Sequence, residues 1–598
     1  MLKKFFLNFL SSFVGAWVAL VLFCVVAVMV VIGLIGKAGI SAASSSGNVK
    51  KHSVMVLDLK GEVIERETPT DIDYIGLVQG DVKSPQTLTG LIDAIRSAKD
   101  NKDVDMIYIK CGGLSAGSAT LHALRAELSD FRESGKKIYA YADAMGNADY
   151  YVATVADSLF MNPDGMLALT GLTASTMYFK DLLDKIGINV QVAKVGTYKS
   201  AVEPYISNEM SEPARAQLDT LLGNIWNVLL SEMAVSRKVK SSVIDKMVSD
   251  DYLFLQRGEE MVGKKLIDKA VYEHTMDARI AKAVGVDKEK LNFVGPEVVG
   301  NSEVEQALNA SGERIAVLYA VGEIMEGTKS GINCEVLVPV ITELADDDDV
   351  KGMVLRVNSP GGSVFGSEQI ADALAYFQKK GKPLAVSMGD YAASGGYWIS
   401  CHADRIFADP ATITGSIGIF GLFPNAAGLM NKIGVTPQFV ATNPKADFPS
   451  LFKAMDEEQM SAMQKFITKG YDRFIERVAT GRKMKPEAVR RIAEGRVWDG
   501  MKAKQLGLVD DLGDLEAAVE WVRGKCKKGD KLKVASYPSV EAGFWDMVKI
   551  SMQSELQTML IKEAVKYAPD AAYADQVSKL LRRRHEQALM PQYDIRLK

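Results

Sequence analysis

The longest uninterrupted apolar stretch of the chain lies at its N-terminus. No charged residue occurs between Phe5 and Gly36, and the most apolar part runs from Phe13 to Ile35. As a helix rising about 1.5 Å per residue, this part would extend roughly 34 Å, enough to cross the hydrocarbon core of a bilayer. A cleaved signal peptide is the alternative, because Ser41–Ser44 would suit a peptidase. Signal peptides have shorter apolar cores of about 7–15 residues, so we expect a membrane anchor.

The charges that flank this stretch predict its orientation. Lys3 and Lys4 precede it, which favours a cytoplasmic N-terminus with the rest of the chain translocated. Lys37, Lys50 and Lys51 lie on the other side and weaken that preference. We predict a single-pass protein whose soluble part lies outside the cytoplasm.

Beyond the apolar stretch, short runs of β-branched residues alternate with helical patterns. Met353–Val357 and Pro383–Met388 are predicted strands on either side of a helix over Gln369–Lys379. Longer helices are predicted at Glu212–Val235 and Asp456–Thr480. Strands that alternate with helices form βαβ units with a mostly parallel sheet, so we predict an α/β fold.

The same pattern occurs twice in the chain. Tyr150–Pro163 aligns with Tyr397–Pro410 at an offset of 247 residues, and Ile186-Gly187 falls on Ile433-Gly434 at the same offset. A constant offset over this length indicates a tandem duplication, so we predict two homologous domains. The predicted segments are 1–12 (cytoplasmic N-terminus), 13–36 (transmembrane anchor), 37–50 (linker), 51–298 (N-terminal repeat), 299–311 (linker), 312–545 (C-terminal repeat) and 546–598 (C-terminal helical tail).

Composition and charge argue against two classes of site. The net charge of −4 and the pI near 6.0 are not those of a nucleic-acid-binding protein. The five cysteines form no CxxC or Cys/His pairing, which argues against structural zinc. We expect no metal, no cofactor and no nucleic-acid partner.

Two loops of small residues in the second half form the candidate site. Asn358–Ser363 follows one predicted strand and Gly389–Tyr397 follows the next. Ser394 lies where a helix should begin, so free N–H groups and the positive helix end would favour a developing oxyanion. Each loop alone fits a plain turn, and Ser394 alone fits a helix N-cap. Together the loops predict an oxyanion hole beside a serine nucleophile.

A histidine base is not expected at this site. His402 is eight residues beyond Ser394 and too far along the predicted helix to take the hydroxyl proton, so we expect no Ser-His-Asp triad here. A lysine can serve as the base when burial lowers its pKa and keeps the amine neutral.

These motifs resemble a known family. Asn358–Ser363, Ala393–Tyr397 and Thr414–Gly418, with Val195–Pro204 from the first half, are similar to motifs of signal peptide peptidase A (protease IV) in its long tandem form, within the Clp protease/crotonase-like superfamily. The resemblance implies two Clp/crotonase-like βαβ domains and a membrane-anchored serine endopeptidase that degrades cleaved signal peptides and other short hydrophobic peptides. It also implies a homo-oligomer in the bacterial cytoplasmic (inner) membrane, with its catalytic part in the periplasm.

The resemblance also assigns residues by position. It implies a Ser/Lys dyad with Ser394 as nucleophile and Lys199, from the other repeat, as general base. Gly361 and Gly395 would donate oxyanion N–H groups, and Ser416 would orient the lysine.

The first repeat departs from this pattern. Asn147 occupies the place of Ser394, and Asp149 occupies the place of Gly396, so the first repeat offers no seryl nucleophile there.

Three alternatives stay open at this point. Lys445 lies within one residue of the repeat equivalent of Lys199 and is a rival base, although it lacks the Tyr-Lys-Ser-Ala context. A crotonase-like acyl-CoA enzyme is a second function, against which the anchor and the lysine segment weigh. A non-catalytic membrane scaffold is a third, against which the intact contexts of Ser394 and Lys199 weigh.

Overall fold

The computed structural model describes most of both predicted repeats. It covers residues 49–66, 86–300, 312–327, 331–527 and 531–538, together with the backbone of Gln587–Leu589. The predicted anchor, and nearly all of the predicted linkers and C-terminal tail, lie outside the described residues. Among the residues that are described, no helix combines the length and apolar character needed to cross a bilayer.

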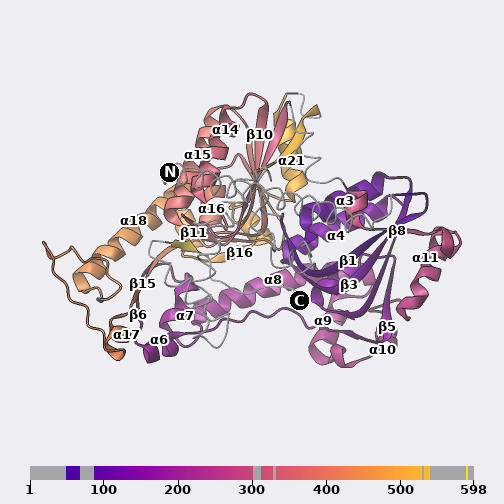
Figure 1. Ribbon diagram of the computed structural model, residues 1–598, viewed down its shortest axis with the longest axis horizontal. Coiled ribbons are helices and arrows are strands. Elements are labelled where there is room, and N and C mark those ends of the chain that lie inside the picture. The colour runs from indigo at the N-terminus through magenta and orange to yellow at the C-terminus, as the bar shows by residue number, and fades with distance from the viewer. Residues whose placement is uncertain are drawn as a thin grey trace, which may run out of the picture.

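The first half is built around a parallel sheet (Figure 1). Its central strands are nearly continuous apolar runs because helices cover both faces, and Leu57, Ile107 and Leu159 are fully buried. The strand order is β2 (Gln86–Thr87), β1 (Ser53–Ile64), β3 (Val104–Ser115), β4 (Lys137–Met145), β5 (Ser158–Leu167) and β7 (Lys269–Ala270), with β8 (Asn292–Val294) also pairing with β1. The helices packed in this half include α3 (Leu88–Asp100), α4 (Ser118–Glu133), α5 (Asn147–Ala153), α9 (Ser241–Asp250), α10 (Gly258–Gly263), α11 (Met276–Val284) and α12 (Pro296–Val299).

The second half repeats this architecture. Its strand order is β16 (Val497–Asp499), β14 (Ile413–Gly415), β12 (Leu384–Ala393), β10 (Val350–Ser359), β9 (Arg314–Val321) and β18 (Lys533–Tyr537), with β13 (Arg405–Ala408) and β17 (Asp511–Leu512) branching from β12. All pairs are parallel except β14 with β16. Its helices include α14 (Cys334–Asp346), α15 (Val364–Lys379), α16 (Gly395–Ser400), α19 (Pro486–Ile492), α20 (Gly500–Gln505) and α21 (Leu515–Lys525). Two copies of one α/β unit confirm the predicted fold class.

The two longest helices begin at side-chain caps. Ser211 accepts a hydrogen bond from the backbone of Ala214 at the start of α8 (Glu212–Arg237). Asp456 accepts one from Gln459 at the start of α18 (Glu457–Gly481). Each cap satisfies one of the free N–H groups of the first turn. Both helices were predicted from the sequence and both are confirmed.

A third, smaller sheet joins the two halves (Figure 1). Strand β6 (Asn189–Val195) leaves the first half and pairs antiparallel with β15 (Ile419–Asn425) of the second, from Asn189 opposite Asn425 to Val195 opposite Ile419. The short helices α6 (Lys180–Ile186), α7 (Glu203–Ile206) and α17 (Ala427–Lys432) lie around this joint. The backbone strand β19 (Gln587–Leu589) pairs with both β15 and β11 (Gly361–Ser363). Because β6 pairs with β15, the residues that follow β6 lie against the second half.

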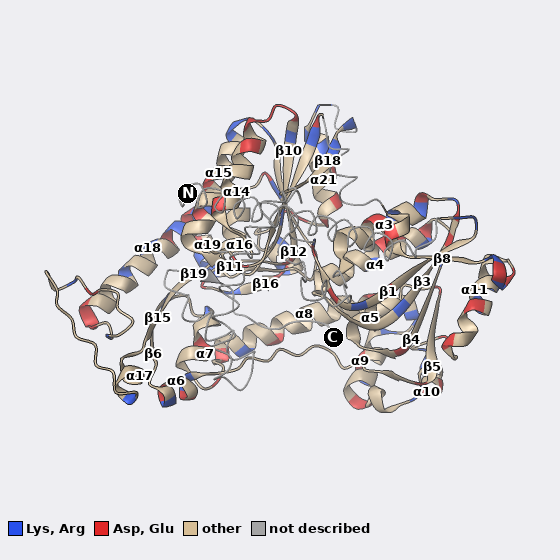
Figure 2. Ribbon diagram, in the orientation of Figure 1, with Lys and Arg blue, Asp and Glu red and all other residues tan. Residues whose placement is uncertain are grey.

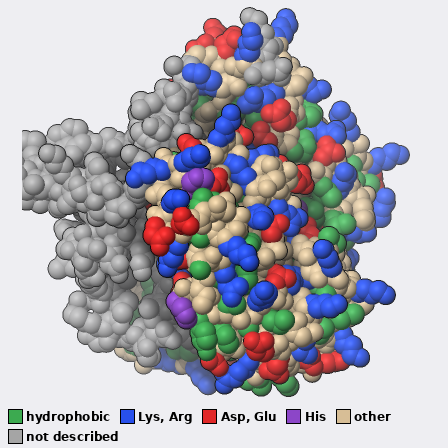
Figure 3. All heavy atoms as spheres, turned by 90° about the vertical axis from the view of Figure 1, so that its right-hand side faces the viewer, with side chains coloured by type: hydrophobic (Ala, Val, Ile, Leu, Met, Phe, Trp, Pro, Cys, Tyr) green, Lys and Arg blue, Asp and Glu red, His purple; other side chains and the backbone are tan. Residues whose placement is uncertain are grey.

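Charged side chains of both signs are interspersed over the two halves (Figure 2). The face of the molecule in Figure 3 likewise mixes basic, acidic and apolar side chains. This mixture agrees with the small net charge of −4.

Candidate active site

Ser394 lies in the turn between β12 and α16. Its backbone has φ 57° and ψ −115°, a conformation that a non-glycine residue adopts at a cost of about 1–3 kcal/mol. Two hydrogen bonds of 2.8 Å hold the turn: the N–H of Ser394 donates to the carbonyl of Gly415, and its carbonyl accepts from Trp398. A strained turn from strand to helix is a recurring way to present a serine nucleophile.

The glycines after Ser394 allow two loops to lie against each other. A Cβ on Gly395 would come within 2.7 Å of Ser367 Oγ and 3.0 Å of Gly362 N. A Cβ on Gly396 would come within 2.7 Å of the carbonyl oxygen of Ser359. Because any larger side chain would separate these backbones, the Gly-Gly pair places the second predicted loop directly against the first.

Two glycines of the first loop are candidates for holding an oxyanion. The N–H of Gly361 donates to Ser359 Oγ at 3.1 Å, so this predicted donor is already engaged within its own loop. Gly362, which the sequence reasoning did not single out, has its N–H group next to Gly395. The sequence contained the signal for this residue, since Gly362 directly follows Gly361 in one Gly-Gly pair.

Lys199 reaches Ser394 from the other half of the chain. It follows β6, is fully buried, and places Nζ 2.8 Å from Ser394 Oγ. Nζ also lies 3.1 Å from Ser416 Oγ and 3.2 Å from the Ser416 carbonyl oxygen. Burial lowers the pKa of Lys199 well below its ordinary value. The structure thus brings together Ser394, Lys199 and Ser416, all three of them fully buried.

The three oxygens around Nζ match the needs of a neutral amine. Such an amine has two hydrogens and one lone pair. The Ser416 carbonyl can only accept a hydrogen bond, and the Ser416 hydroxyl lies 3.4 Å from the Gly495 carbonyl, to which it can donate. Both Ser416 oxygens can therefore accept from Nζ, which leaves the lone pair for the hydroxyl hydrogen of Ser394. This is the arrangement that a general base requires.

A segment of the second half encloses the lysine. A Cβ on Gly495 would come within 2.7 Å of Lys199 Cβ, and a Cβ on Gly418 would come within 3.3 Å of Lys199 Cδ. The N–H of Tyr198 donates to the carbonyl of Glu494 at 2.9 Å. Neither glycine was assigned this role from the sequence, because the role depends on a contact with a distant part of the chain.

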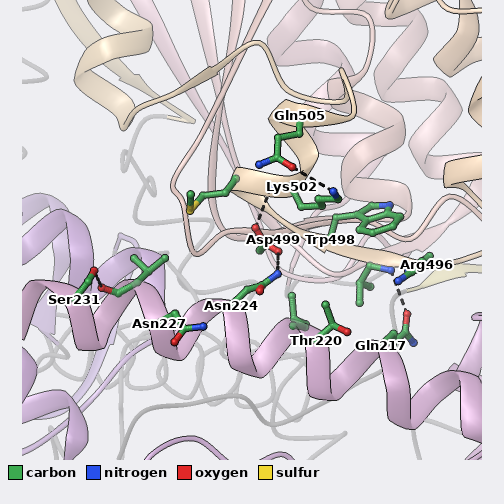
Figure 4. A pocket seen from close by; sticks show the side chains of 14 residues that line it. Gln217, Thr220, Asn224, Asn227, Ser231, Arg496, Trp498, Asp499, Lys502 and Gln505 are labelled. Carbon is green, nitrogen blue, oxygen red and sulfur yellow. Dashed lines mark hydrogen bonds between the residues drawn. The ribbon is translucent and has the colours of Figure 1, made fainter. Parts of the chain in front are cut away.

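Gln217 ties the lysine loop to its surroundings. Its amide donates to the Tyr198 carbonyl at 3.3 Å and accepts from the N–H of Val497 at 3.3 Å. It also lines a cavity of about 580 Å³ between α8 and the β16–α20 segment, where Asn224 donates to Asp499 at 2.8 Å (Figure 4). Neither Ser394 nor Lys199 lines this cavity, so it is separate from the site chemistry.

The rival groups lie elsewhere. Lys445 is exposed, and its Nζ pairs with Glu458 at 2.7 Å. His402 follows the end of α16, and no hydrogen bond joins it to Ser394 in the described part of the chain. The described residues likewise contain no cluster of His, Cys, Asp and Glu arranged to hold a metal ion.

At the corresponding place in the first half, Asn147 and Asp149 bind backbone N–H groups. Asn147 accepts from the N–H groups of Thr170 and Gly171 at 3.0 and 3.2 Å. The Asp149 carboxylate accepts from three backbone N–H groups, those of Gly113 (3.2 Å), Leu114 (3.1 Å) and Gly146 (3.1 Å). The first half thus has an asparagine in place of the seryl nucleophile at the position that corresponds to Ser394, as the duplication predicted.

Comparison with known proteins identifies the family. The model of peptidase family S49 matches residues 130–287 and 376–528, one region in each half. Protease 4 of Salmonella typhi is 34% identical over 574 residues, covering 93% of this chain and 90% of the relative. Protease 4 of Haemophilus influenzae is 33% identical and covers 80% of each chain. A putative signal peptide peptidase SppA of Enterococcus faecium is 35% identical over 44% of this chain and 81% of its own length.

The family matches include both halves of the site. Lys199 falls in the first matched region and Ser394 in the second. The similarity to the two bacterial relatives extends over most of their length as well as most of this chain. The chain belongs to peptidase family S49 and is a serine protease.

Proposed function

We propose that this protease is a membrane-anchored endopeptidase with a Ser394/Lys199 dyad that degrades cleaved signal peptides and other short hydrophobic peptides. The observation that carries the proposal is the 2.8 Å separation of Lys199 Nζ and Ser394 Oγ in a fully buried site. At that distance a neutral amine can take the hydroxyl proton directly.

The first half of the reaction forms an acyl-enzyme. Ser394 Oγ bonds to the carbonyl carbon of the scissile peptide while its proton passes to Lys199 Nζ, and the carbonyl oxygen becomes an oxyanion. The N–H groups of Gly362 and Gly395 can stabilise this charge, with Gly361 joining if it releases Ser359. Lys199 then gives its proton to the leaving amine as the C–N bond breaks. Ser416 holds the lysine through both transfers.

The second half releases the peptide acid. Lys199, neutral again, takes a proton from a water molecule whose oxygen attacks the ester carbonyl. Collapse of the second tetrahedral intermediate breaks the bond to Ser394 Oγ, which recovers its proton from Lys199. The dyad is restored without a metal or a redox step.

An extended peptide can lie beside the dyad in the position of strand β19. Strand β19 lies between β11 and β15, and it pairs antiparallel with both. β11 contains the oxyanion glycines Gly361 and Gly362, so a main chain in this position runs past the reacting groups. Peptides that add a strand to a sheet bind through their main chain, which suits a protease acting on many sequences.

The substrate class and location rest on the N-terminal stretch and the relatives. The Enterococcus faecium relative is named a signal peptide peptidase. Signal peptides left in a bilayer are apolar, and an anchor over Phe13–Ile35 would keep the protease beside them. We therefore place the protein in the bacterial inner membrane, with the dyad in the periplasm and several copies assembled together.

A serine-directed fluorophosphonate tests the dyad. The purified full-length protein should be labelled at Ser394, as located by mass spectrometry of the modified peptide. Ser394→Ala and Lys199→Ala should not be labelled, whereas Lys445→Ala, the matched control, should be labelled at the normal rate. Labelling of another serine, or full labelling of Lys199→Ala, would reject the dyad.

Protease accessibility tests the location. Trypsin added to spheroplasts should digest the folded part of the chain, and trypsin added to inverted vesicles should not. The reverse pattern would contradict the periplasmic placement. A mature N-terminus near Ala43 would contradict the anchor.

A further inference from the structure

Among the described residues, the joint between the two halves has one of the two strand pairs that the duplication predicts. In the observed pair, β6 of the first half lies against β15 of the second. At the repeat offset of 247, β6 corresponds to residues 436–442 and β15 corresponds to residues 172–178. Neither of these segments belongs to a strand in the described part of the chain. Each half therefore has one segment that pairs in the joint and one corresponding segment that does not, which we call the unjoined segment.

The two unjoined segments have the properties of strands that lack a partner. Residues 172–178 alternate strictly between half-buried and exposed positions, with Thr173, Ser175 and Met177 facing outward. Residues 436–442 are almost entirely exposed, and they include Phe439 (47% exposed) and Val440 (fully exposed). Figure 1 shows the loop after α17, which contains them, at the margin of the molecule and away from both large sheets.

Neither segment carries a charged residue. Exposed strand edges usually carry lysines or other charges that prevent pairing with a second chain. An uncharged extended segment with exposed apolar side chains instead favours an interface. The partner must offer a complementary uncharged strand, and another copy of this chain offers one.

We propose that residues 436–442 of one copy pair antiparallel with residues 172–178 of a second copy, in the register of the β6·β15 joint. The observed ladder places Ala193 opposite Gly421 and Val192 opposite Leu422. The repeat offset then places Val440 opposite Ala174 and Phe439 opposite Ser175. This inference deepens the assembly of several copies put forward under the proposed function, and it names the surfaces.

A pair of hydrogen bonds between a glutamine side chain and the backbone of one residue, here called a glutamine clamp, supports this register. In the observed joint, the Gln191 amide donates to the Met455 carbonyl at 2.9 Å and accepts from the Met455 N–H at 2.8 Å. The repeat equivalent of Gln191 is Gln438, which is also a glutamine and is exposed. Counted from the helix caps, which are 245 residues apart, the counterpart of Met455 is Met210: it directly precedes the cap of α8 as Met455 directly precedes the cap of α18. In the described part of the chain no hydrogen bond involves the Met210 backbone. Its N–H and carbonyl are therefore available for a second clamp.

The proline in the segment also fits. Pro437 would lie opposite Met177, and at the same position the observed joint accommodates Pro424 opposite Val190. A proline in a strand is tolerated where its missing N–H group is not needed by the ladder. The existing joint tolerates a proline at this pair, so the proposed one can as well.

The contact is heterologous, because the two copies contribute different segments. Each copy would offer residues 436–442 to one neighbour and accept those of another at residues 172–178. Contacts of this kind close into rings when the rotation between copies permits, and otherwise grow as filaments. Either assembly would cover Phe439 and Val440.

Cysteine cross-linking of the detergent-solubilised full-length protein tests the register. Ser175→Cys and Phe439→Cys in the same chain should form a ladder of disulfide-linked species on mild oxidation. A mixture of the two single variants should give linked dimers and nothing larger, because each chain then has one competent face. The register-shifted pair Ser175→Cys with Thr436→Cys is the matched control and should remain unlinked, as should each single variant, which retains the native cysteines. Absence of linkage in the Ser175/Phe439 pair, or equal linkage in the shifted pair, would overturn the register.

Mass measurement tests the surface itself. Val440→Glu should reduce the particle mass in detergent to that of one 65.1 kDa chain with its micelle. Tyr252→Glu, at a similarly exposed apolar residue outside both segments, should leave the mass unchanged. Unchanged mass in Val440→Glu would overturn the proposal, as would loss of vesicle binding without loss of mass, which would identify a lipid-facing segment. Fluorophosphonate labelling of Ser394, measured on the same samples, reports the dyad independently of assembly.

Discussion

The two glycine loops of this chain lie at corresponding places but have different contents. Gly113, near the end of β3, and Gly361, just after β10, both have positive φ, 89° and 103°. In the first half the N–H groups of Gly113 and Leu114 bind the Asp149 carboxylate, whereas in the second half Gly361 and Gly362 lie beside Gly395, which follows Ser394. One loop therefore binds a carboxyl group of the protein itself, and the other is placed to bind an oxyanion that forms during the reaction.

This difference shows what the loop does in chemical terms. Burial raises the pKa of Asp149 from its ordinary value, while backbone N–H groups oppose that rise. The N–H groups of the loop therefore favour negative charge even in a buried setting, which is the property required of an oxyanion hole. In the first half the N–H groups of the loop bind Asp149 and have a structural role. Lys199, which also belongs to the first half, acts on Ser394 of the second half.

The largest effect is expected from the dyad. Ser394→Ala should lower kcat for peptide hydrolysis by about 10⁴–10⁶-fold, and Lys199→Ala should do the same. The double variant should be no worse than either single variant, because the two groups act as a unit. Lys445→Ala should retain nearly full activity. Additive losses in the double variant would show that Lys199 and Ser394 act independently.

Rebuilding the corresponding loop of the first half should not restore the activity that Ser394→Ala loses. Asn147→Ser with Asp149→Gly, introduced into Ser394→Ala, recreates the serine and the following glycine of the active loop. Lys199 lies beside Ser394 in the other half, so the new serine lacks this buried base, and we expect activity and fluorophosphonate labelling to stay at the Ser394→Ala level. Labelling of the new serine would show that a glycine loop with a serine suffices without Lys199.

The pH dependence of activity should reflect the protonation state of Lys199. Burial lowers the pKa of Lys199, so its amine becomes neutral at a pH well below 10.5. Activity should rise as pH increases through that lowered pKa, because only the neutral amine can accept the serine proton. Ser416→Ala removes one hydrogen-bond partner of Nζ, and it should cost roughly 10–100-fold in kcat/KM. It should also displace the acid limb of the pH profile, which a change confined to folding would leave in place.

The smallest effect on activity is expected at the filled anion site. Asp149→Ala would leave three backbone N–H groups unpaired, which should lower the free energy of unfolding by roughly 1–3 kcal/mol. Hydrolysis at Ser394 should change by less than about twofold, since the site is not catalytic. Denaturant midpoints compared with those of Asp164→Ala, an exposed aspartate in the same half, would measure the difference.

The sequence predicted most clearly what depends on local pattern. The α/β alternation, the duplication and the long helices at 212–235 and 456–480 follow from periodicity and repeat spacing. Ser394 was found because small residues around a serine at a strand-to-helix turn form a local signal. These features need no knowledge of the distant contacts.

The rest of the site depends on contacts between the halves. Lys199 was assigned through family resemblance, since nothing local distinguishes it from other lysines before β6 is placed against β15. Gly495 and Gln217 were missed for the same reason. Gly495 contacts Lys199 from the other half of the chain, and Gln217 joins Tyr198 to Val497 of the other half. Residue spacing alone does not predict such contacts.

Enclosing the catalytic lysine has a consequence for stability. In the unfolded chain Lys199 binds a proton up to its ordinary pKa of 10.5, whereas burial lowers that pKa in the folded protein. Between the two values the unfolded state holds more protons, so the free energy of unfolding increases as pH rises through this window. At neutral pH the residue therefore acts against folding, and Lys199→Met should give an inactive protein with a higher melting temperature. Lys199 would then be a residue that the protein needs for activity and that lowers the stability of its fold.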